Sequence, residues 1–229
     1  MSRDRDMACT VLVFLLAGVM CVAASDDCIC ASPHGHPQDV FCSSDYALRG
    51  LVTSGPKKET IKIMQPPDKP LTRNVLSYIV EIREVYRGGQ IIRRTTGLQH
   101  RNTTLLLPSE VRITTDDNAC AAILPLNTEQ LIAGYSDGAR LEVFSCNWVE
   151  PWGNLTVSQQ IAVKRYYGRH CACRTSLCSL LDPLGTLLDF ECAREHLYCR
   201  LRRDGATCGW RSIGRWYREC VLDIHARNN

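Results

Sequence analysis

Two cysteines separated by a single residue, Cys28 and Cys30, are the first residues whose chemistry can be interpreted. A disulfide needs Cα atoms about 4.4–6.8 Å apart in a suitable orientation, which such close neighbours do not readily satisfy. In an oxidising compartment each cysteine is therefore expected to pair with a distant one. The step between them then forms a stiff, exposed edge, anchored at both ends and suited to insertion into the cleft of a partner.

A metal site is the alternative chemistry for this region, because His34 and His36 follow the two cysteines closely. Structural zinc sites usually combine cysteines spaced about two to four residues apart with a matching second pair. The one-residue spacing and the expected oxidation fit that pattern poorly. We therefore favour disulfides and expect the protein to have no cofactor of its own.

The segment ahead of these cysteines has the pattern of a secretory signal peptide. Residues 1–6 are polar and include two arginines, and residues 8–24 are almost wholly apolar or small. This pattern is typical of a signal peptide, whereas a retained membrane span needs about 20 apolar residues. We assign residues 1–24 to the signal peptide, with cleavage as late as residue 27 as the alternative. The mature protein is expected to be secreted and extracellular, without a membrane span.

The cysteine content agrees with export. The chain has 14 cysteines, of which Cys9 and Cys21 lie in the leader, so twelve remain. A high, even number of cysteines in an exported chain predicts a disulfide framework. The sequons at Asn102 and Asn154 make these two asparagines candidate glycosylation sites. The formal net charge of +3 gives no reason to expect a nucleic-acid partner.

The interval between Cys42 and Cys120 lacks cysteine and is typical of β-strands. Apolar and polar residues alternate there, most regularly over residues 75–86. The charged residues 57–70 contain three prolines and are expected to form a long, exposed hairpin connection. Strands are predicted at residues 46–52, 75–86, 90–96, 103–107, 130–134 and 140–144.

Residues 156–169 change to helical character, and Thr156 or Ser158 can cap the start of the helix. About five antiparallel strands followed by a helix predict a small closed barrel of the oligonucleotide/oligosaccharide-binding (OB) type. The predicted fold class is mainly β with α: a five- to six-stranded OB-fold barrel with a flanking helix, over residues 28–171. Residues 172–229, which are rich in cysteine, are expected to form a small disulfide-held C-terminal subdomain.

Several motifs together resemble the tissue inhibitors of metalloproteinases, a family with a netrin-like N-terminal domain. Each motif is weak alone, but their order and spacing over nearly the whole mature chain make the resemblance strong. The matching stretches are the opening Cys-x-Cys, His36-Pro37-Gln38, Phe41-Cys42, Ser44-Asp45, residues 78–88, residues 131–134, Cys146 with Val149 and Pro151-Trp152, Cys171-Ala172-Cys173, Cys178 and residues 203–210.

The resemblance implies a set of disulfides. In the N-terminal domain these are Cys28–Cys120, Cys30–Cys146 and Cys42–Cys171. The C-terminal part departs from the family pattern, because residues 179–191 lack a cysteine and Cys220 is additional. Local matching there implies Cys173–Cys208, Cys178–Cys220 and Cys192–Cys199. Matching by order alone implies Cys173–Cys220, Cys178–Cys192 and Cys199–Cys208, and we favour the first set.

The resemblance also implies inhibition of zinc metalloendopeptidases of the matrix-metalloproteinase type. In that family the amine and carbonyl oxygen of the first cysteine, here Cys28, chelate the catalytic zinc of the protease. The zinc then belongs to the target, the partners are secreted or cell-surface metalloproteinases, and a monomer is expected. The metalloproteinase-binding residues carried over are Cys28, Ile29, Cys30, Ala31, Ser32, Asp117, Asn118 and Ala119.

The true start of the mature chain decides between two functions. If Ser25-Asp26-Asp27 stay attached, the nitrogen of Cys28 is an amide, which is a poor zinc ligand. The alternative function is then a non-inhibitory extracellular binding or signalling module for matrix, a glycosaminoglycan or a receptor. A run of C-terminal arginines is either a site for sulfated glycans or an ordinary solvated surface: Arg194, Arg200, Arg202, Arg203, Arg211, Arg215 and Arg218.

Catalysis is the least favoured function. His170, His196 and His225 are scattered, and Ser176 and Ser179 lack the strand-turn-helix context of a catalytic serine. The cysteines are expected to be oxidised and therefore unable to act as nucleophiles. We expect an enzyme inhibitor and not an enzyme.

Overall fold

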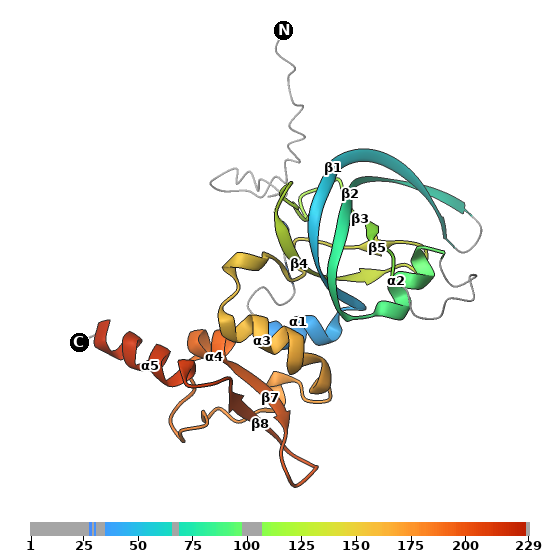
Figure 1. Ribbon diagram of the computed structural model, residues 1–229. Helices are drawn as coiled ribbons and strands as arrows, with labels where there is room; N and C mark the ends of the chain where they lie inside the picture. Colours follow the sequence, from blue (N-terminus) through green and yellow to red (C-terminus); the bar gives the residue numbers. More distant parts are fainter. Residues whose placement is uncertain (1–27, 29, 31–34, 66–68, 98–106, 228–229) are drawn as a thin grey trace, which may run out of the picture.

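The computed structural model describes residues 28, 30, 35–65, 69–97 and 107–227 (Figure 1). An all-β barrel forms the larger part, and helices cover one side of it. A smaller part rich in disulfides follows along the chain. No helix in these described ranges is long and apolar enough to cross a membrane.

Five strands close into the barrel. In spatial order β1 pairs with β2, β2 with β3, β3 with β5, β5 with β4, and β4 again with β1, while the short β6 pairs with the other edge of β4. Only the β3–β5 pair is parallel among these ladders. This closed ring confirms the predicted OB-type barrel. The strands are β1 (Tyr46–Gln65), β2 (Lys69–Arg87), β3 (Glu110–Asp116), β4 (Glu129–Ser136), β5 (Leu141–Glu142) and β6 (Val149–Pro151).

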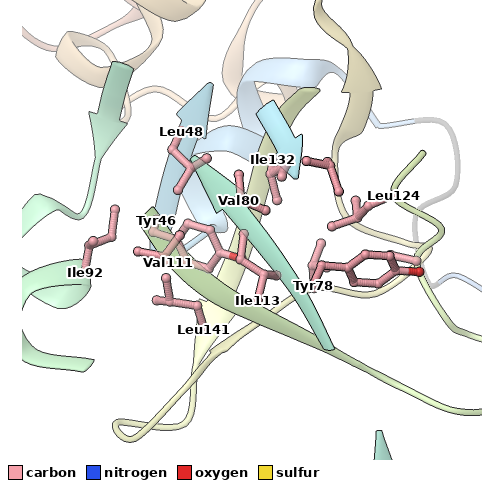
Figure 2. Close-up of a cluster of buried hydrophobic side chains, with 13 residues drawn as sticks. Tyr46, Leu48, Tyr78, Val80, Ile92, Val111, Ile113, Leu124, Ile132 and Leu141 are labelled. Atoms are coloured by element: carbon pink, nitrogen blue, oxygen red, sulfur yellow. The ribbon is translucent and has the colours of Figure 1, made fainter. Parts of the chain in front are cut away.

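Side chains from every strand of the ring meet inside the barrel (Figure 2). Because successive residues of a strand point to opposite faces, alternate positions such as Tyr78 and Val80 face inward. Tyr46 also lies in this core, and its hydroxyl donates to the carbonyl oxygen of Glu142, 3.2 Å away. The buried members of the cluster are Tyr46, Leu48, Val52, Tyr78, Val80, Ile92, Val111, Ile113, Ala122, Leu124, Ile132, Leu141 and Val143.

The hairpin connection predicted over residues 57–70 does lie in a hairpin, but most of it is paired strand of β1 and β2 and not a connecting loop. Their pairing continues from Lys57 opposite Ser77 to Gln65 opposite Lys69. The register shifts between Val52 and Lys57, and a bulge of this kind accommodates Pro56. Main-chain hydrogen bonds then sustain the ladder, although only Val75 and Ser77 are buried among its side chains that the structure describes. In Figure 1 this hairpin curves away from the barrel.

The strand predicted over residues 90–96 is a helix, α2 (Gly89–Thr95). Gly88 has a φ of 70°, and a Cβ there would lie 2.8 Å from the Cα of Tyr46, so only glycine permits this tight turn. The chain therefore reverses after β2, and α2 buries Ile92 against the barrel. Most of the strand predicted at residues 103–107 lies outside the described residues.

Three helical segments cover the outer face of the barrel: α1 (Pro37–Ser43), α3 (Val157–Arg165) and the 3-10 turn η3 (Tyr167–Arg169). The predicted cap at Thr156 is present. Its hydroxyl accepts from the amide of Gln159, whose side chain accepts from the amide of Thr156. Apolar side chains of these segments and of the barrel strands form a second hydrophobic cluster, separate from the one inside the barrel. Its buried residues are Phe41, Ala47, Leu131, Ala133, Trp152, Leu155, Ala162, Val163, Tyr167, Tyr198 and Ile213.

The C-terminal part contributes Tyr198 and Ile213 to that second cluster, so one apolar core joins it to the barrel side. A third cluster, around Cys192, Leu197 and Tyr217, holds this part together. The boundary between residues 171 and 172 stays a prediction. The elements here are η4 (Thr175–Leu177), α4 (Phe190–His196), the hairpin β7 (Leu197–Leu201) and β8 (Cys208–Ser212), and α5 (Trp216–Arg227); the remaining 3-10 turn, η2 (Trp152–Asn154), precedes α3.

Two of the C-terminal disulfides differ from the favoured set. Cys173 pairs with Cys208 as implied, but Cys178 pairs with Cys199, and Cys192 pairs with Cys220. The pairings Cys178–Cys220 and Cys192–Cys199 are therefore wrong, and the order-based set also fails.

The packing of the C-terminal helices explains this difference. Helices α4 and α5 pack against each other, so Cys192 on α4 meets Cys220 on α5 in the third cluster. Cys199 lies on β7, where its sulfur approaches the carbonyl oxygen of Arg174 at 3.4 Å, close to the segment that carries Cys178. Cys192 and Cys199, although close in sequence, therefore pair with different cysteines, Cys220 and Cys178.

Candidate functional site

Two neighbouring loops of the barrel hold Cys28 and Cys30. Cys28 is bonded to Cys120, which follows β3, and Cys30 is bonded to Cys146, which follows β5. The two loops are joined by a hydrogen bond of 2.9 Å from the amide of Ser145 to the carbonyl oxygen of Cys120. As a result the two disulfides lie side by side, with the sulfur of Cys28 3.8 Å from that of Cys146. We call the segment that begins at Cys28 and ends at Cys30 the cysteine edge.

The turn at residues 117–119 lies next to this edge because Cys120 follows it directly. All three of its residues are exposed. The side-chain oxygen of Asn118 accepts from the amide of Cys120 at 2.8 Å, and its carbonyl oxygen accepts from Ala121 at 3.0 Å, which fixes the turn. The carboxylate of Asp117 lies 3.0 Å from the ammonium of Lys58 on β1.

The fold therefore brings together five of the eight residues expected to bind the protease: Cys28, Cys30, Asp117, Asn118 and Ala119. The other three, Ile29, Ala31 and Ser32, lie outside the described residues.

Helix α1 follows the cysteine edge along the chain, and its first turn contacts the C-terminal part. His36 precedes the helix; its Nδ1 accepts from the amide of Gln38 at 3.1 Å, and its Nε2 lies 3.0 Å from the carbonyl oxygen of Ala193. Both contacts require the neutral ring, with the hydrogen on Nε2. Burial of the ring accordingly lowers the pKa of His36 to about 4.

Gln38 is a structurally important residue that could not be identified from the sequence. The His-Pro-Gln motif gives no indication of its role, yet Gln38 is fully buried and bonded to the backbone of the C-terminal part. A polar residue between a proline and the apolar face of a helix is only a weak indication that its side chain is buried and hydrogen-bonded. The third disulfide, Cys42–Cys171, holds the end of the same helix and agrees with the implied pairing.

The described cysteines near the edge cannot act as metal ligands in this state. The sulfurs of Cys28, Cys30 and Cys146 gather within 4.8 Å of one another, but each is committed to a disulfide. Metal binding requires a thiolate, and both nitrogens of His36 already have hydrogen-bond partners. The second sulfur cluster, Cys173, Cys199 and Cys208, is oxidised in the same way. The other histidine of the motif, His34, lies outside the described residues.

One arrangement superficially resembles a hydrolase site. Nδ1 of His196 lies 2.9 Å from the hydroxyl of Ser158, and its Nε2 lies 3.5 Å from the carboxylate of Glu195. A catalytic serine must reach the substrate, whereas Ser158 is only 1 % exposed. These contacts instead join α3 to α4.

A cleft of about 510 Å³ opens beside the Cys30–Cys146 disulfide, between the barrel loops and the start of α3. Asn154 is exposed at this cleft, and its side-chain amide donates to Glu150 at 2.9 Å. A glycan at this sequon would therefore emerge beside the cysteine edge. The other candidate glycosylation site, Asn102, lies outside the described residues.

Comparison with known proteins matches this arrangement to one family. The family model described as "Tissue inhibitor of metalloproteinase" covers residues 26–210. Metalloproteinase inhibitor 3 of Gallus gallus is 29% identical over 177 residues, which are 76% of this chain and 71% of the relative.

Two further relatives extend the similarity along the chain. Metalloproteinase inhibitor 4 of Mus musculus is 24% identical over 86% of this chain and 85% of its own. Metalloproteinase inhibitor 3 of Scyliorhinus torazame is 25% identical over 87% of each chain. All three relatives are named as inhibitors and not as enzymes. With a family match over most of its length, and with the cysteine edge and barrel described above, the chain belongs to the tissue inhibitor of metalloproteinase family.

Proposed function

We propose that the protein inhibits zinc metalloendopeptidases of the matrix-metalloproteinase type, and that Cys28 at the start of the processed chain binds their catalytic zinc. The observation that carries the proposal is the attachment of Cys28 and Cys30 to two adjacent barrel loops through separate disulfides. This attachment holds Cys28 and Cys30 beside the exposed turn at residues 117–119.

The chemistry follows from the nature of a catalytic zinc site. Such a zinc has three protein ligands and an open position, where a bound water becomes the nucleophile. The amine and carbonyl oxygen of one residue can chelate the ion together and displace that water. An α-amine has an ordinary pKa of about 8, so coordination readily favours its neutral form. Ile29 would enter the pocket beside the zinc.

Pre-ordering of the edge supports tight binding. A free peptide loses about 1–2 kcal/mol per residue in backbone conformational entropy when it becomes fixed. In this protein the two disulfides restrict the residues at both ends of the edge before the protease is met. Most of that cost is therefore incurred during folding and not during binding.

The test compares two forms of the same protein, one beginning at Cys28 and one retaining Ser25-Asp26-Asp27. We expect the first to inhibit a matrix-metalloproteinase catalytic domain and the second to inhibit weakly or not at all, because its Cys28 nitrogen is an amide. N-terminal sequencing of protein exported by a eukaryotic host identifies the natural form and tests secretion. Equal potency of the two forms refutes zinc binding by Cys28, and inactivity of both refutes the inhibitory function.

Binding of sulfated matrix glycans is a second candidate function, favoured by a hollow on the β7–β8 hairpin. The hollow has a volume of about 310 Å³ and is lined by Arg200, Arg202, Arg203, Gly209, Trp210 and Arg211. Among the described residues, none of these four arginines forms an ion pair with a carboxylate. Unpaired cations gathered around one hollow create a positive potential that attracts polyanions.

Heparin chromatography tests this second function. Reversing the charge at Arg200 and Arg211 should lower the salt concentration needed for elution, since these contacts are electrostatic. The matched control reverses Arg215 and Arg218, which lie outside the hollow; Arg215 already pairs with Glu219 at 3.0 Å. Equal loss of retention in both variants would show dependence on net charge alone and would contradict a site in the hollow.

A further inference from the structure

Gln38 forms an unusual contact for a buried side chain. It lies in the first turn of α1 and is fully buried. Its Oε1 accepts from the amide of Cys199 at 2.8 Å, and its Nε2 donates to the carbonyl oxygen of the same residue at 2.8 Å. The side-chain amide thus bonds to Cys199 of β7 in the two-way pattern of a neighbouring strand. The carbonyl oxygens of His170 and Cys173 lie within 3.3 Å of the same Nε2.

His36 and Asp39, which lie close to Gln38 in the sequence, also form hydrogen bonds with the C-terminal part. Nε2 of His36 lies 3.0 Å from the carbonyl oxygen of Ala193 at α4. The carboxylate of Asp39 accepts from the amide of Thr175 at 2.9 Å. Three polar side chains at the start of α1 therefore form hydrogen bonds with backbone groups of three separate C-terminal segments, α4, β7 and η4.

The same turn of α1 is connected to the cysteine edge by only a few residues. Cys30 is fixed to Cys146, and α1 begins at Pro37. Pro37 and Val40 of α1 line the same cleft as Cys30 and Cys146, so the first turn of α1 lies close to the disulfide that fixes one end of the edge. Gln38 holds the first turn of α1 against the C-terminal part, while the Cys42–Cys171 disulfide holds the end of the helix.

A second buried glutamine shows that this bonding is not a general consequence of burial. Gln130 on β4 is also fully inaccessible, but neither its Nε2 nor its Oε1 has a hydrogen-bond partner among the described residues. Gln130 fills space in the barrel wall, whereas Gln38 links two parts of the molecule. The two residues form a matched pair for mutation.

We propose that Gln38 is a positioning residue, through which the C-terminal subdomain holds α1 and thereby the cysteine edge in its binding orientation. This inference rests on the proposed inhibitory function and assigns the C-terminal subdomain a part in it. Gln38 does not touch the protease. It acts through α1, on the downstream side of the edge.

The test uses the full processed chain with Gln38→Leu, and Gln130→Leu as the control of equal size change. Hydrogen exchange is measured by mass spectrometry on peptides that contain Cys28 and Cys30, and inhibition of a metalloproteinase catalytic domain is measured in parallel. We expect Gln38→Leu to speed exchange in those peptides and to raise the inhibition constant about tenfold, since ordering of the edge is then required on binding. Gln130→Leu should change neither.

Normal exchange at the edge in a folded Gln38→Leu protein, with faster exchange only around Cys199, would overturn the proposal. If Gln38→Leu fails to fold, Asp39→Ala removes the neighbouring contact to Thr175 and should give a smaller change of the same kind; no change at the edge there also counts against the proposal. If the wild-type chain does not inhibit at all, the inhibitory function is refuted, while the exchange data still decide the role of Gln38.

Discussion

Gly134 on β4 is a sharp test of how closely the barrel is packed. It lies opposite Tyr46 of β1, where the ring closes. A Cβ at this position would lie 2.7 Å from the hydroxyl oxygen of Tyr46 and closer still to the carbonyl oxygen of Glu142 on β5. Backbone strain is not involved, because Gly134 is not among the glycines with positive φ. The substitution Gly134→Ala must therefore push β5 away from β4.

The cost can be estimated from three contributions. Overpacking in a dense core typically costs about 1–3 kcal/mol. Displacement of β5 also weakens the hydrogen bond from the Tyr46 hydroxyl to the Glu142 carbonyl oxygen. A typical intramolecular hydrogen bond contributes about 0.5–1.5 kcal/mol to stability. Alanine offsets about 0.4–1 kcal/mol by reducing the entropy of the unfolded chain. Together these contributions lower the expected free energy of unfolding by about 0.5–4 kcal/mol.

The assay is denaturant unfolding with the disulfides intact, in which a shift of the midpoint at constant slope reports a change in stability. Gly153→Ala is the matched control, because a Cβ there meets nothing within 4 Å and Gly153 also lacks a positive φ. This control should be neutral or slightly stabilising. Equal midpoints for the two variants would refute the close-packing argument.

Two further predictions concern His36 and the C-terminal cysteines. Because burial lowers the pKa of His36 from 6.5 to about 4, the unfolded chain binds more protons between these values, and the free energy of unfolding falls as the pH drops through this window. His36→Gln should flatten that dependence in denaturant titrations across the window; an unchanged slope would contradict the buried neutral ring. Proteolysis without reduction, followed by mass spectrometry, should recover peptides linked by Cys178–Cys199 and Cys192–Cys220. Recovery of a Cys178–Cys220 peptide would contradict the packing of α4 against α5.

The barrel was predictable because its strands carry a period-two pattern. Residues 75–86 alternate, and the structure extends this stretch into β2. Residues 90–96 misled the same reasoning, since the β-branched pair Ile91-Ile92 favours a strand. The conformation was decided instead by the turn at Gly88, which sends the chain into α2. Local propensity is a weak guide where a tight turn fixes the direction of the chain.

The extent of the paired strands in the hairpin and the pairing of the C-terminal cysteines depend on tertiary contacts that no short sequence pattern records. Prolines and charges over residues 57–70 indicate an exposed hairpin connection, but they do not show how far the strands continue into it, because a strand edge tolerates both when a bulge removes one ladder bond. In the C-terminal part, the cysteine order could not reveal that α4 packs against α5. The contacts of Gln38 could not be predicted for the same reason, because its partners lie more than a hundred residues away along the chain.

The spans of the disulfides have a consequence for biosynthesis. The three bonds that hold the cysteine edge and α1 join residues 92, 116 and 129 positions apart, whereas the C-terminal bonds span 35, 21 and 28. At a synthesis rate of about 5–20 residues per second, the N-terminal cysteines wait on the order of ten seconds for their partners to be made. During that interval Cys28, Cys30 and Cys42 are reduced or wrongly paired. The N-terminal cysteines thus wait longest for their partners, although Cys120, Cys146 and Cys171 are made before the last C-terminal cysteines. The yield of active protein should therefore depend on the disulfide isomerase capacity of the cell that makes it.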